Sequence, residues 1–343
     1  MLRVTALTRG RDSPAARFRV RQYAAPLMAH GIRLDERYPR VGGVPPERRW
    51  LRPAWAVGAI VSRLPAVIAS HRGDLTLLLR ELFPTAVTLE PLTREPRVLD
   101  VDDAIWLHRR GRFVHRLARM ANVLVCGNDF LAEHLGQWNR NIEILPTAVD
   151  TDVFVPPTRS PERATRIGWV GTSSNLQYLE VCAPALESVL RRHPDVELCV
   201  VCDRAPSSPS LRRLRLRYVP WSPQAELDLL GSSSVGVMPL HDSLWARGKC
   251  SFKMLLYMAC GIPVVVSPVG MNTYVLGRGN VGFAAASVRE WEEALETLMT
   301  DRAAAEEMGR EGRRVVQEEF SVRTLAPRLA RILKRAAGCP PAP

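Results

Sequence analysis

Residues 248–270 read GKCSFKMLLYMACGIPVVVSPVG, and this stretch predicts a loop, a short helix, a tight turn and a buried strand, in that order. Apolar residues recur at helical spacing through its middle, and Ser251 is placed to cap the first turn. Gly261 can take the left-handed conformation that ends a helix, and Pro263 prevents the helix from continuing into the valines that follow. A helix followed by a buried strand indicates an α/β domain.

Two lysines, Lys249 and Lys253, place positive charge at the start of this helix, although the chain has only three lysines in all. A cation at a helix N-terminus is disfavoured by about 0.3–1 kcal/mol because it faces the positive end of the helix dipole. A phosphate shared by the lysines, by nearby Arg247 and by the first-turn N–H groups would remove that conflict. A solvated basic loop is the alternative interpretation. The stretch therefore predicts an anion site at the start of the helix.

Strand-like and helix-like segments alternate along the rest of the chain, which predicts right-handed crossovers and parallel sheets. The alternation stops at the proline-rich stretch 151–165 and then restarts, so that stretch is the expected linker. Two doubly wound domains of this kind would hold a ligand in a cleft between the carboxyl ends of their sheets. The expected division is a first domain at 1–155, a second at 165–320, a C-terminal helix at 321–337 that can pack back on the first domain, and a disordered tail at 338–343.

The composition is that of a folded protein, with 343 residues, 46% of them hydrophobic and 24% charged. A formal net charge of +12 implies attraction to nucleic acid, acidic lipid or phosphorylated substrates. The arginines are spread over the whole chain without an RNA-binding aromatic motif or a zinc-finger pattern, so we expect no specific nucleic-acid partner. An anionic membrane surface remains open as a partner.

Cysteine usage and apolar runs bear on the compartment. The seven cysteines are an odd number and lie mostly in apolar runs, which indicates reduced thiols in a cytoplasmic protein. Cys199 and Cys202 form a CxxC pattern, but positions three apart in a strand face opposite sides, so no metal or redox site is expected. The apolar run at 55–69 is short and interrupted by Arg63 and Pro65, so we expect that it does not span a bilayer. The N-terminus has no recognisable export signal, so no export is expected. We expect a cytoplasmic protein that can associate peripherally with the inner face of the membrane.

Several motifs occur in a characteristic order along the chain. GWVG at 168–171, VPWSPQAELDLL at 219–230, the stretch at 248–270 and EGRRVV at 311–316 lie in the second half, and VLDVDDAIW at 98–106 and GNDFLA at 127–132 lie in the first. Together they resemble the retaining, family 4-like GT-B glycosyltransferases (glycosyl transferases group 1). The resemblance implies two Rossmann-like domains facing each other across a cleft. It also implies a retaining, metal-independent transfer of a hexosyl-type sugar, with no cofactor besides the nucleotide-sugar donor.

Donor-binding residues follow from the resemblance and agree with local patterns. Gly171 ends a strand before a helix, where a diphosphate can approach the backbone, although a purely structural turn is the alternative. Trp221 ends a strand where the family holds its nucleobase, with core packing as the alternative. The family's E-x7-E carboxylates are absent, since Gly248 and Leu256 occupy their places. The expected donor-binding residues are Gly171, Thr172, Ser173, Pro220, Trp221, Arg247, Gly248 and Leu256, and the expected catalytic residues are Lys249, Lys253 and Asp103.

The expected acceptor site lies in the first domain. Asp100, Asp102 and Asp103 follow or end a strand, where a carboxylate can orient or deprotonate an acceptor hydroxyl. Helix capping is the alternative, and a DxD metal site is disfavoured because that motif belongs to the GT-A architecture. His115 and His134 are expected to be packing or surface residues. The expected acceptor-binding residues are Gly10, Arg17, Arg19, Asp102 and Asn128, with a solvated helix face as the alternative for the two arginines.

The sequence thus predicts a glycosyltransferase of bacterial glycan or cell-surface polysaccharide synthesis, with a nucleotide-sugar donor and a sugar, lipid-linked or other acceptor. The missing carboxylates favour an alternative, a non-catalytic sugar-nucleotide-binding or scaffold protein of the same fold. A nicotinamide-dependent dehydrogenase is disfavoured because no G-x-G-x-x-G follows a strand in either half.

Overall fold

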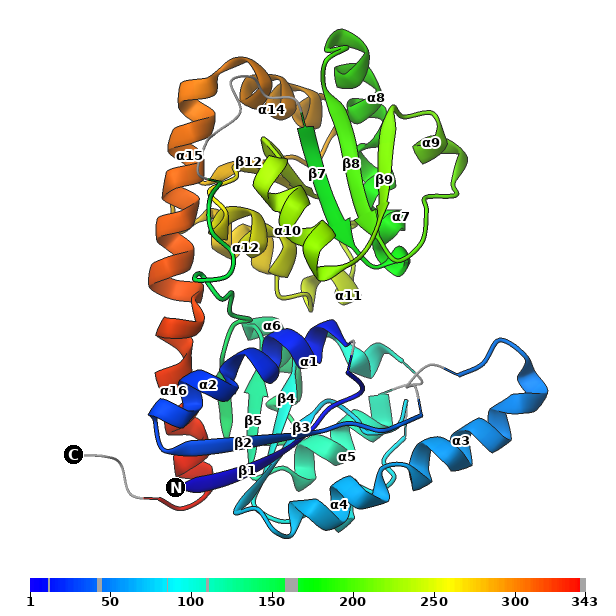
Figure 1. Cartoon of the computed structure of the whole chain (residues 1–343), viewed down its shortest axis with the longest axis vertical. Helices are drawn as coiled ribbons and strands as arrows, with labels where there is room; N and C mark the ends of the chain where they lie inside the picture. Colours follow the sequence, from blue (N-terminus) through cyan, green and yellow to red (C-terminus); the bar gives the residue numbers. More distant parts are fainter. Residues whose placement is uncertain (12, 42–44, 85, 109–110, 158–165, 340–343) are drawn as a thin grey trace. The chain divides into compact units, whose positions relative to one another are not determined.

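The computed structural model describes residues 1–11, 13–41, 45–84, 86–108, 111–157 and 166–339 (Figure 1). The chain divides into two compact units. Unit 1 comprises Met1–Ala148, Gly248–Cys250 and Val322–Pro343, and unit 2 comprises Val149–Arg247 and Ser251–Ser321. Part of the expected linker, 158–165, and the end of the expected tail, 340–343, lie outside the described residues.

Unit 1 is built on a six-stranded parallel sheet with the strand order β2-β1-β3-β4-β5-β6. Every residue of the central strands β3, β4 and β5 is buried, as expected for a parallel sheet covered on both faces. The strands are β1 (Leu2–Leu7), β2 (Ile32–Arg37), β3 (Leu75–Leu79), β4 (Arg97–Val101), β5 (Val123–Cys126) and β6 (Ile142–Ile144). The helices are α1 (Pro14–Arg19), α2 (Ala24–Ala29), α3 (Arg52–Val61), α4 (Leu64–Ser70), α5 (Arg112–Met120), α6 (Asp129–Leu135) and α16 (Val322–Ala336).

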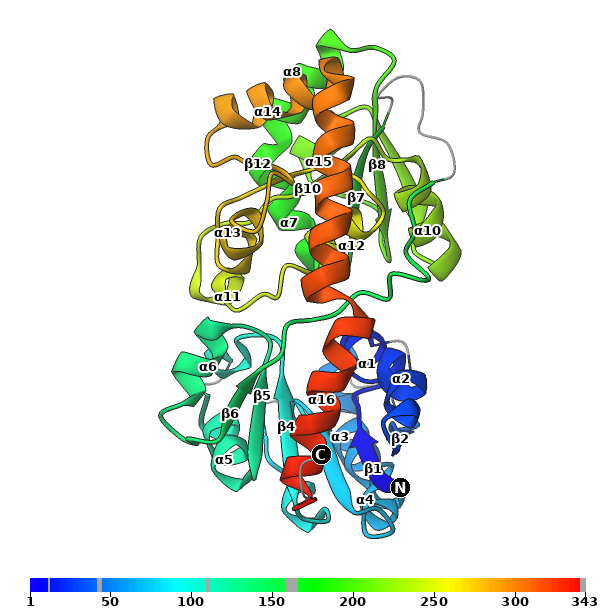
Figure 2. The ribbon, with the colours of Figure 1, turned by 90° about the vertical axis from the view of Figure 1, so that its left-hand side faces the viewer.

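The C-terminal helix α16 belongs to unit 1 and contributes to its core (Figure 2). Leu325, Leu329 and Leu333 recur at a spacing of four and are buried with residues of β1, β3 and β4. This spacing places them on one face of the helix, while Arg323 and Arg331 lie on the exposed side. The last helix of the chain therefore completes the core of the unit that the N-terminal residues begin.

Unit 2 repeats the architecture with the strand order β12-β11-β10-β7-β8-β9, again all parallel. Two tryptophans, Trp169 on β7 and Trp291 on α14, are almost fully buried in its core. The strands are β7 (Arg166–Gly171), β8 (Glu197–Cys202), β9 (Leu216–Pro220), β10 (Val235–Met238), β11 (Val264–Val266) and β12 (Gly282–Ala284). The helices are α7 (Leu176–Leu179), α8 (Ala183–Arg192), α9 (Pro209–Arg212), α10 (Pro223–Ser232), α11 (Leu244–Arg247), α12 (Phe252–Ala259), α13 (Met271–Leu276), α14 (Val288–Thr300) and α15 (Arg302–Val315).

The stretch 248–270 folds as predicted into a helix, a turn and a buried strand. Helix α12 ends before Gly261, which has a φ of +69°, and the three valines of β11 are fully buried. The turn conformation favours glycine because a side chain at positive φ is strained. The sequence pattern around Pro263 therefore identifies the boundary between helix and strand correctly.

The apolar run near residue 60 differs from expectation in its length. The helical run Arg49–Ser70 has 22 residues, because a single 3-10 turn, α3 and α4 follow one another closely. By length and composition alone this run is long and apolar enough to cross a membrane, because the helical residues extend beyond the expected run 55–69. One face of the run packs against unit 1, as described below.

Candidate functional site

The end of strand β7 lies against the first turn of helix α12 in unit 2. A Cβ atom added to Gly171 would stand 2.8 Å from Cε of Lys253 and 2.9 Å from the ring of Trp169. The ammonium group of Lys253 lies 5.4 Å from the centroid of that ring. Only glycine lets the backbone come this close to the lysine stem, because any side chain would displace it. The fold thus brings together two residues that the sequence had marked separately as phosphate-binding.

The start of α12 differs from the predicted capping. Ser251 has a φ of +51°, and its hydroxyl donates to Oδ1 of Asn272 at 2.6 Å instead of capping the helix. Asn272 in turn donates to the backbone carbonyl of Ser267 at 2.9 Å. The left-handed conformation directs the serine side chain into this buried network, which explains why the predicted side-chain cap is wrong.

Three neighbouring strands of unit 2 present polar or aromatic groups at their carboxyl ends. Thr172 and Ser173 follow β7, Asp203 follows β8, and Trp221 follows β9. This edge of a parallel sheet is where open α/β folds bind ligands. The predicted residues Thr172, Ser173 and Trp221 therefore occupy one edge together with Asp203.

Asp203 was not among the predicted residues, yet it holds the turn after β7. Its carboxylate accepts from the backbone N–H of Ser173 at 2.6 Å and from the Ser173 hydroxyl at 2.9 Å. Burial raises the pKa of the Asp203 carboxyl, but the Ser173 hydrogen bonds outweigh it and hold that pKa below its usual range. Its position directly after a strand adjacent to β7 was the sequence signal that could have identified it.

The Trp221 indole is exposed at the end of β9. Its side chain is 39% exposed, and its backbone N–H donates to the carbonyl of Cys202 at 2.9 Å. Pro220 is exposed as well. The alternative that Trp221 belongs to the core is therefore wrong, and its ring offers a stacking surface.

Arg247 ends α11 and already has an anionic partner. Its guanidinium makes two hydrogen bonds to Asp242, at 2.8 and 2.9 Å, and both side chains are exposed. An exposed pair of this kind is weak, so a more highly charged anion can compete for the arginine. The backbone of Gly270, which has a φ of +56°, packs on Arg247 so closely that an added Cβ would lie 2.9 Å from its Cα.

Two predicted donor contacts are placed differently. Leu256 is 1% exposed inside the core of unit 2, so the expectation that it contacts the donor is corrected: its apolar side chain is covered and faces no ligand. Gly248 is buried and Lys249 half-buried, and both group with unit 1, whereas Lys253 belongs to unit 2. Within unit 2, Lys253 is the lysine that lies beside Gly171 at the end of β7.

In unit 1, Arg19 is a structural residue. It is 2% exposed and forms a two-pronged ion pair with Asp100, at 2.9 and 2.8 Å, while also donating to the carbonyl of Leu145 at 2.8 Å. Burial alone would lower the pKa of Arg19, but Asp100 outweighs it and raises that pKa. The predicted acceptor role of Arg19 is therefore wrong. Arg17 is half-buried, with its guanidinium 4.5 Å from the ring of Phe18.

Arg80, which sequence reasoning missed, organises the two aspartates after β4. It has a φ of +59°, and its guanidinium pairs with Asp102 and, at 2.6 Å, with Asp103. Burial raises the pKa of Asp102, but the Arg80 guanidinium outweighs it and lowers that pKa below its usual range. Ala104 precedes the following 3-10 turn, so neither aspartate caps it. Across the described residues, no group of three or more His, Cys, Asp or Glu side chains could hold a metal ion.

The remaining predicted residues of unit 1 fall into two groups. Asn128 caps α6, with Oδ1 accepting from the N–H of Leu131 at 2.9 Å, which gives it a structural role. Gly10 lies in an open loop, with no atom within 4 Å of an added Cβ. His115 stacks on Trp138 and His134 stacks on Trp106, and the Nε2 atoms of the two histidines lie 3.3 Å apart. Both are therefore packing residues, as expected.

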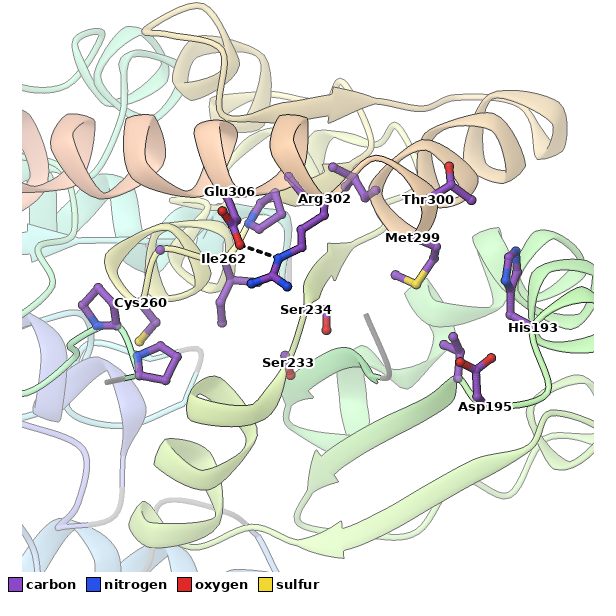
Figure 3. Close-up of a pocket in the computed structure, with 17 residues that line it drawn as sticks. His193, Asp195, Ser233, Ser234, Cys260, Ile262, Met299, Thr300, Arg302 and Glu306 are labelled. Carbon is purple, nitrogen blue, oxygen red and sulfur yellow. Dashed lines mark hydrogen bonds and ion pairs between the residues drawn. The ribbon is translucent and has the colours of Figure 1, made fainter. Parts of the chain in front are cut away.

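Unit 2 also contains a cavity of about 490 Å³ (Figure 3), and none of the predicted site residues is among those that line it. Its lining includes Val196, Ser234 and Pro263, which immediately precede β8, β10 and β11. It therefore lies at the amino ends of the strands, opposite to the edge that carries Gly171 and Trp221. Because ligands of such sheets bind at the carboxyl ends, we base no donor site on it.

Residues 164–301 match the model of a protein family described as Glycosyl transferases group 1. The chain is also similar to a D-inositol 3-phosphate glycosyltransferase of Paenarthrobacter aurescens (strain TC1). The two are 26% identical over 221 residues, which is 58% of this chain and 53% of that protein. The match thus spans about half the length of this curated relative.

Solved structures with the same fold cover nearly the whole chain. Sucrose-phosphate synthase of Thermosynechococcus elongatus has a TM-score of 0.73 and 14% identity, covering 98% of this chain and 99% of its own. Anabaena HepE in complex with UDP and glucose has a TM-score of 0.70 and 13% identity, covering 97% of this chain and 100% of its own. WaaG, a glycosyltransferase involved in lipopolysaccharide biosynthesis, has a TM-score of 0.68 and 14% identity, covering 96% and 99%. The predicted fold class, two Rossmann-like domains of the GT-B kind, is confirmed.

Proposed function

Because residues 164–301 match the family model of the glycosyl transferases group 1, we propose that the protein transfers a sugar from a nucleotide-sugar donor to an acceptor. The similarity to the D-inositol 3-phosphate glycosyltransferase supports this reaction class. The similarity to WaaG supports a role in bacterial glycan or cell-surface polysaccharide synthesis.

The close approach of Gly171 to Lys253 carries the proposal. A nucleotide-sugar leaves its diphosphate behind when the sugar is transferred, and the charge that develops on that group must be stabilised. At Gly171 the backbone is free of a side chain, and the stem of Lys253 lies directly beside it. We assign the diphosphate to this point, with Lys253 as its charge-assisted partner. Asp203 fixes the adjacent turn through Ser173, so the turn requires little rearrangement when the donor binds.

The exposed ring of Trp221 is assigned to the nucleobase. It follows β9, which is separated from β7 in the sheet by β8 alone. An exposed indole next to an extended backbone can stack on a base. UDP is the first nucleotide to test, because the HepE structures contain UDP.

Three finer features belong to the same proposal. We assign the leaving-group charge to Lys253 and Arg247 without a metal ion, and we expect retention of anomeric configuration on the strength of the family resemblance. Asp103, held by Arg80, is assigned to the acceptor hydroxyl. A sugar or lipid-linked acceptor and a cytoplasmic location complete the account. Retention is tested by the anomeric configuration of the product, and metal independence by turnover in EDTA.

A second candidate function is sugar-nucleotide binding without transfer. One observation favours it: Leu256 stands in the core where the family has a ribose-binding carboxylate. A thermal-shift screen of UDP-, GDP- and ADP-sugars, followed by turnover assays on each hit, separates the two functions. Transfer is supported if a nucleotide-sugar raises the melting temperature and the assay then shows nucleotide release and a glycosylated product. Stabilisation without turnover for any acceptor in a broad panel supports the binding protein instead.

A further inference from the structure

Helices α3 and α4 of unit 1, whose place in the fold Figure 1 shows, expose a stripe of large apolar side chains. Val57 and Val61 lie four residues apart on α3, and Leu64 and Ile68 lie four apart on α4, so each pair shares one face of its helix. Their exposed fractions are 64%, 54%, 41% and 62%, and Trp50, just before α3, is 72% exposed. This concentration is unusual for the surface of a soluble domain, where large apolar residues are normally scattered.

The opposite face of the same helices is fixed to unit 1. Ala59, Ala66 and Val67 are buried there, and the ring of Trp55 lies 5.5 Å from that of Phe83. The core of unit 1 is therefore satisfied by one side of the helices. The exposed stripe is not part of that core, so its apolar side chains are available to contact a surface outside the unit.

Arginines lie at the start of the stripe, where they outnumber one exposed acid, Glu47, and the run 49–70 itself contains no acidic residue. Between residues 49 and 70 the charged residues are Arg49, Arg52 and Arg63, all of them cations. Arg48, Arg49 and Arg52 are exposed beside Trp50. Arg63 is 4% exposed and donates to the backbone carbonyl of Thr8 at 3.1 Å, so it belongs to the packed face. An apolar stripe with exposed cations at its start is complementary to a surface that has an apolar layer bordered by anionic groups.

We propose that this face docks on an anionic lipid surface. The docking face comprises Trp50, Val57, Val61, Leu64 and Ile68 together with the arginines at 48, 49 and 52. Helices of this kind lie in the interface plane, with apolar side chains in the acyl boundary and cations on anionic headgroups. An exposed tryptophan at one end is typical of the interface between lipid and water.

The helices lie on the membrane and do not cross it. The run Arg49–Ser70 has the length and composition of a membrane span. Crossing, however, would pull Arg63 away from the Thr8 carbonyl and strip Ala66 and Val67 from the core of unit 1. A second copy of this chain is a poorer occupant, because it offers the same three cations, and Glu47 is too little acid to pair with them. The proposal does not depend on the donor site, since it concerns a different unit and a different ligand.

Sedimentation of the full chain with vesicles tests the proposal. The protein is expected to bind vesicles of phosphatidylcholine and phosphatidylglycerol and to bind phosphatidylcholine vesicles much more weakly. Replacing Val57, Val61 and Ile68 by Ser should weaken binding at least about tenfold, because that apolar area no longer leaves water. Replacing Arg48, Arg49 and Arg52 by Gln should weaken binding to the anionic vesicles by a similar factor. These side chains are exposed, and an unchanged melting temperature confirms that the variants are folded.

Matched controls come from unit 2. Val153, Val155 and Val288 are exposed too, though somewhat less than the replaced apolar residues, and Arg191, Arg212 and Arg213 are exposed arginines. Serine and glutamine replacements at these positions should leave vesicle binding unchanged. Quenching of Trp50 fluorescence by brominated lipid, lost in Trp50→Phe, would place this end of the face in the bilayer. Equal binding by docking and control variants, or a dimer that only the docking variants dissociate, would overturn the proposal.

Discussion

Lys253 crosses over the backbone of Gly171 so closely that an added Cβ on the glycine would stand 2.8 Å from the lysine Cε. One residue ends strand β7 and the other lies in the first turn of α12, and the parallel sheet of unit 2 brings them together. The contact links the glycine turn to the lysine charge in a single geometric unit. A side chain at Gly171 would therefore change both the backbone surface and the position of the cation.

Replacement of Gly171 by Ala is expected to weaken nucleoside-diphosphate binding at least about tenfold, since the new methyl displaces Lys253 and occupies the ligand's path to the backbone. Some loss of stability should accompany it, because the buried Trp169 ring lies 2.9 Å from the new atom. Calorimetric titration with UDP, GDP and ADP measures the binding. Gly231→Ala is the matched control, because open space surrounds that glycine in α10. If both alanine variants bind alike, the assignment of the diphosphate to Gly171 is wrong.

Asp103→Asn is expected to lower the rate of sugar transfer about a hundredfold while sparing donor affinity, as for loss of a general base. The amide keeps the size of the side chain and can still accept from Arg80, which pairs with Asp103 at 2.6 Å. Steady-state kinetics with donor and acceptor varied separately gives the two effects. A proportional loss of transfer and donor binding would argue against an acceptor role for Asp103.

Arg19→Ala is expected to destabilise the protein by about 3–5 kcal/mol, because it leaves the buried Asp100 carboxylate without its partner. The double variant Arg19→Met/Asp100→Leu should be less destabilised, since no buried charge then lacks a partner. Arg17→Ala, on the same helix and half-buried, should cost much less. Urea titrations compare the free energies of unfolding. Equal costs at Arg17 and Arg19 would mean that the buried pair is not the source of stability.

The free energy of unfolding is expected to fall as the pH drops below about 6.5. Burial lowers the pKa of His115, with Arg119 adding to the effect, and burial lowers the pKa of His134, with His115 adding. The unfolded chain therefore takes up protons first. This stabilisation is present above the ordinary histidine pKa and is lost as the pH falls through the folded values. His134→Phe should keep the stack on Trp106 and flatten the pH dependence. Urea titrations at several pH values measure the free energy of unfolding. If His134→Phe shows the same pH dependence as the wild type, this histidine pair is not its source.

Local patterns were enough to predict the helix, turn and strand of the stretch 248–270. Gly261, Pro263 and the valine run determine where α12 ends and β11 begins through backbone geometry alone, so the sequence carries the information directly. Gly171 and Lys253 could each be marked in the same way. Their contact could not be predicted, because it depends on the order of strands in the sheet.

The wrong predictions for Arg19 and Leu256 have a common physical reason. Arg19 and Leu256 have side chains whose role depends on burial, and burial is set by partners distant in sequence: Asp100 for the arginine, and the core of unit 2 for the leucine. Arg80 and Asp203 were missed because each acts by holding another residue. A sequence motif reports the residue that touches a ligand more readily than the residue that positions it.

Calorimetric titration of Lys253→Ala with the nucleoside diphosphate that binds the wild-type protein tests the central claim most directly. The donor diphosphate is assigned to Lys253 beside Gly171, so the variant should bind the nucleoside diphosphate at least about 1 kcal/mol more weakly, as loss of a charge-assisted contact requires. Its affinity for the corresponding nucleoside, which lacks phosphate, should be unchanged. Equal affinity of the variant and the wild type for the diphosphate would contradict the assignment.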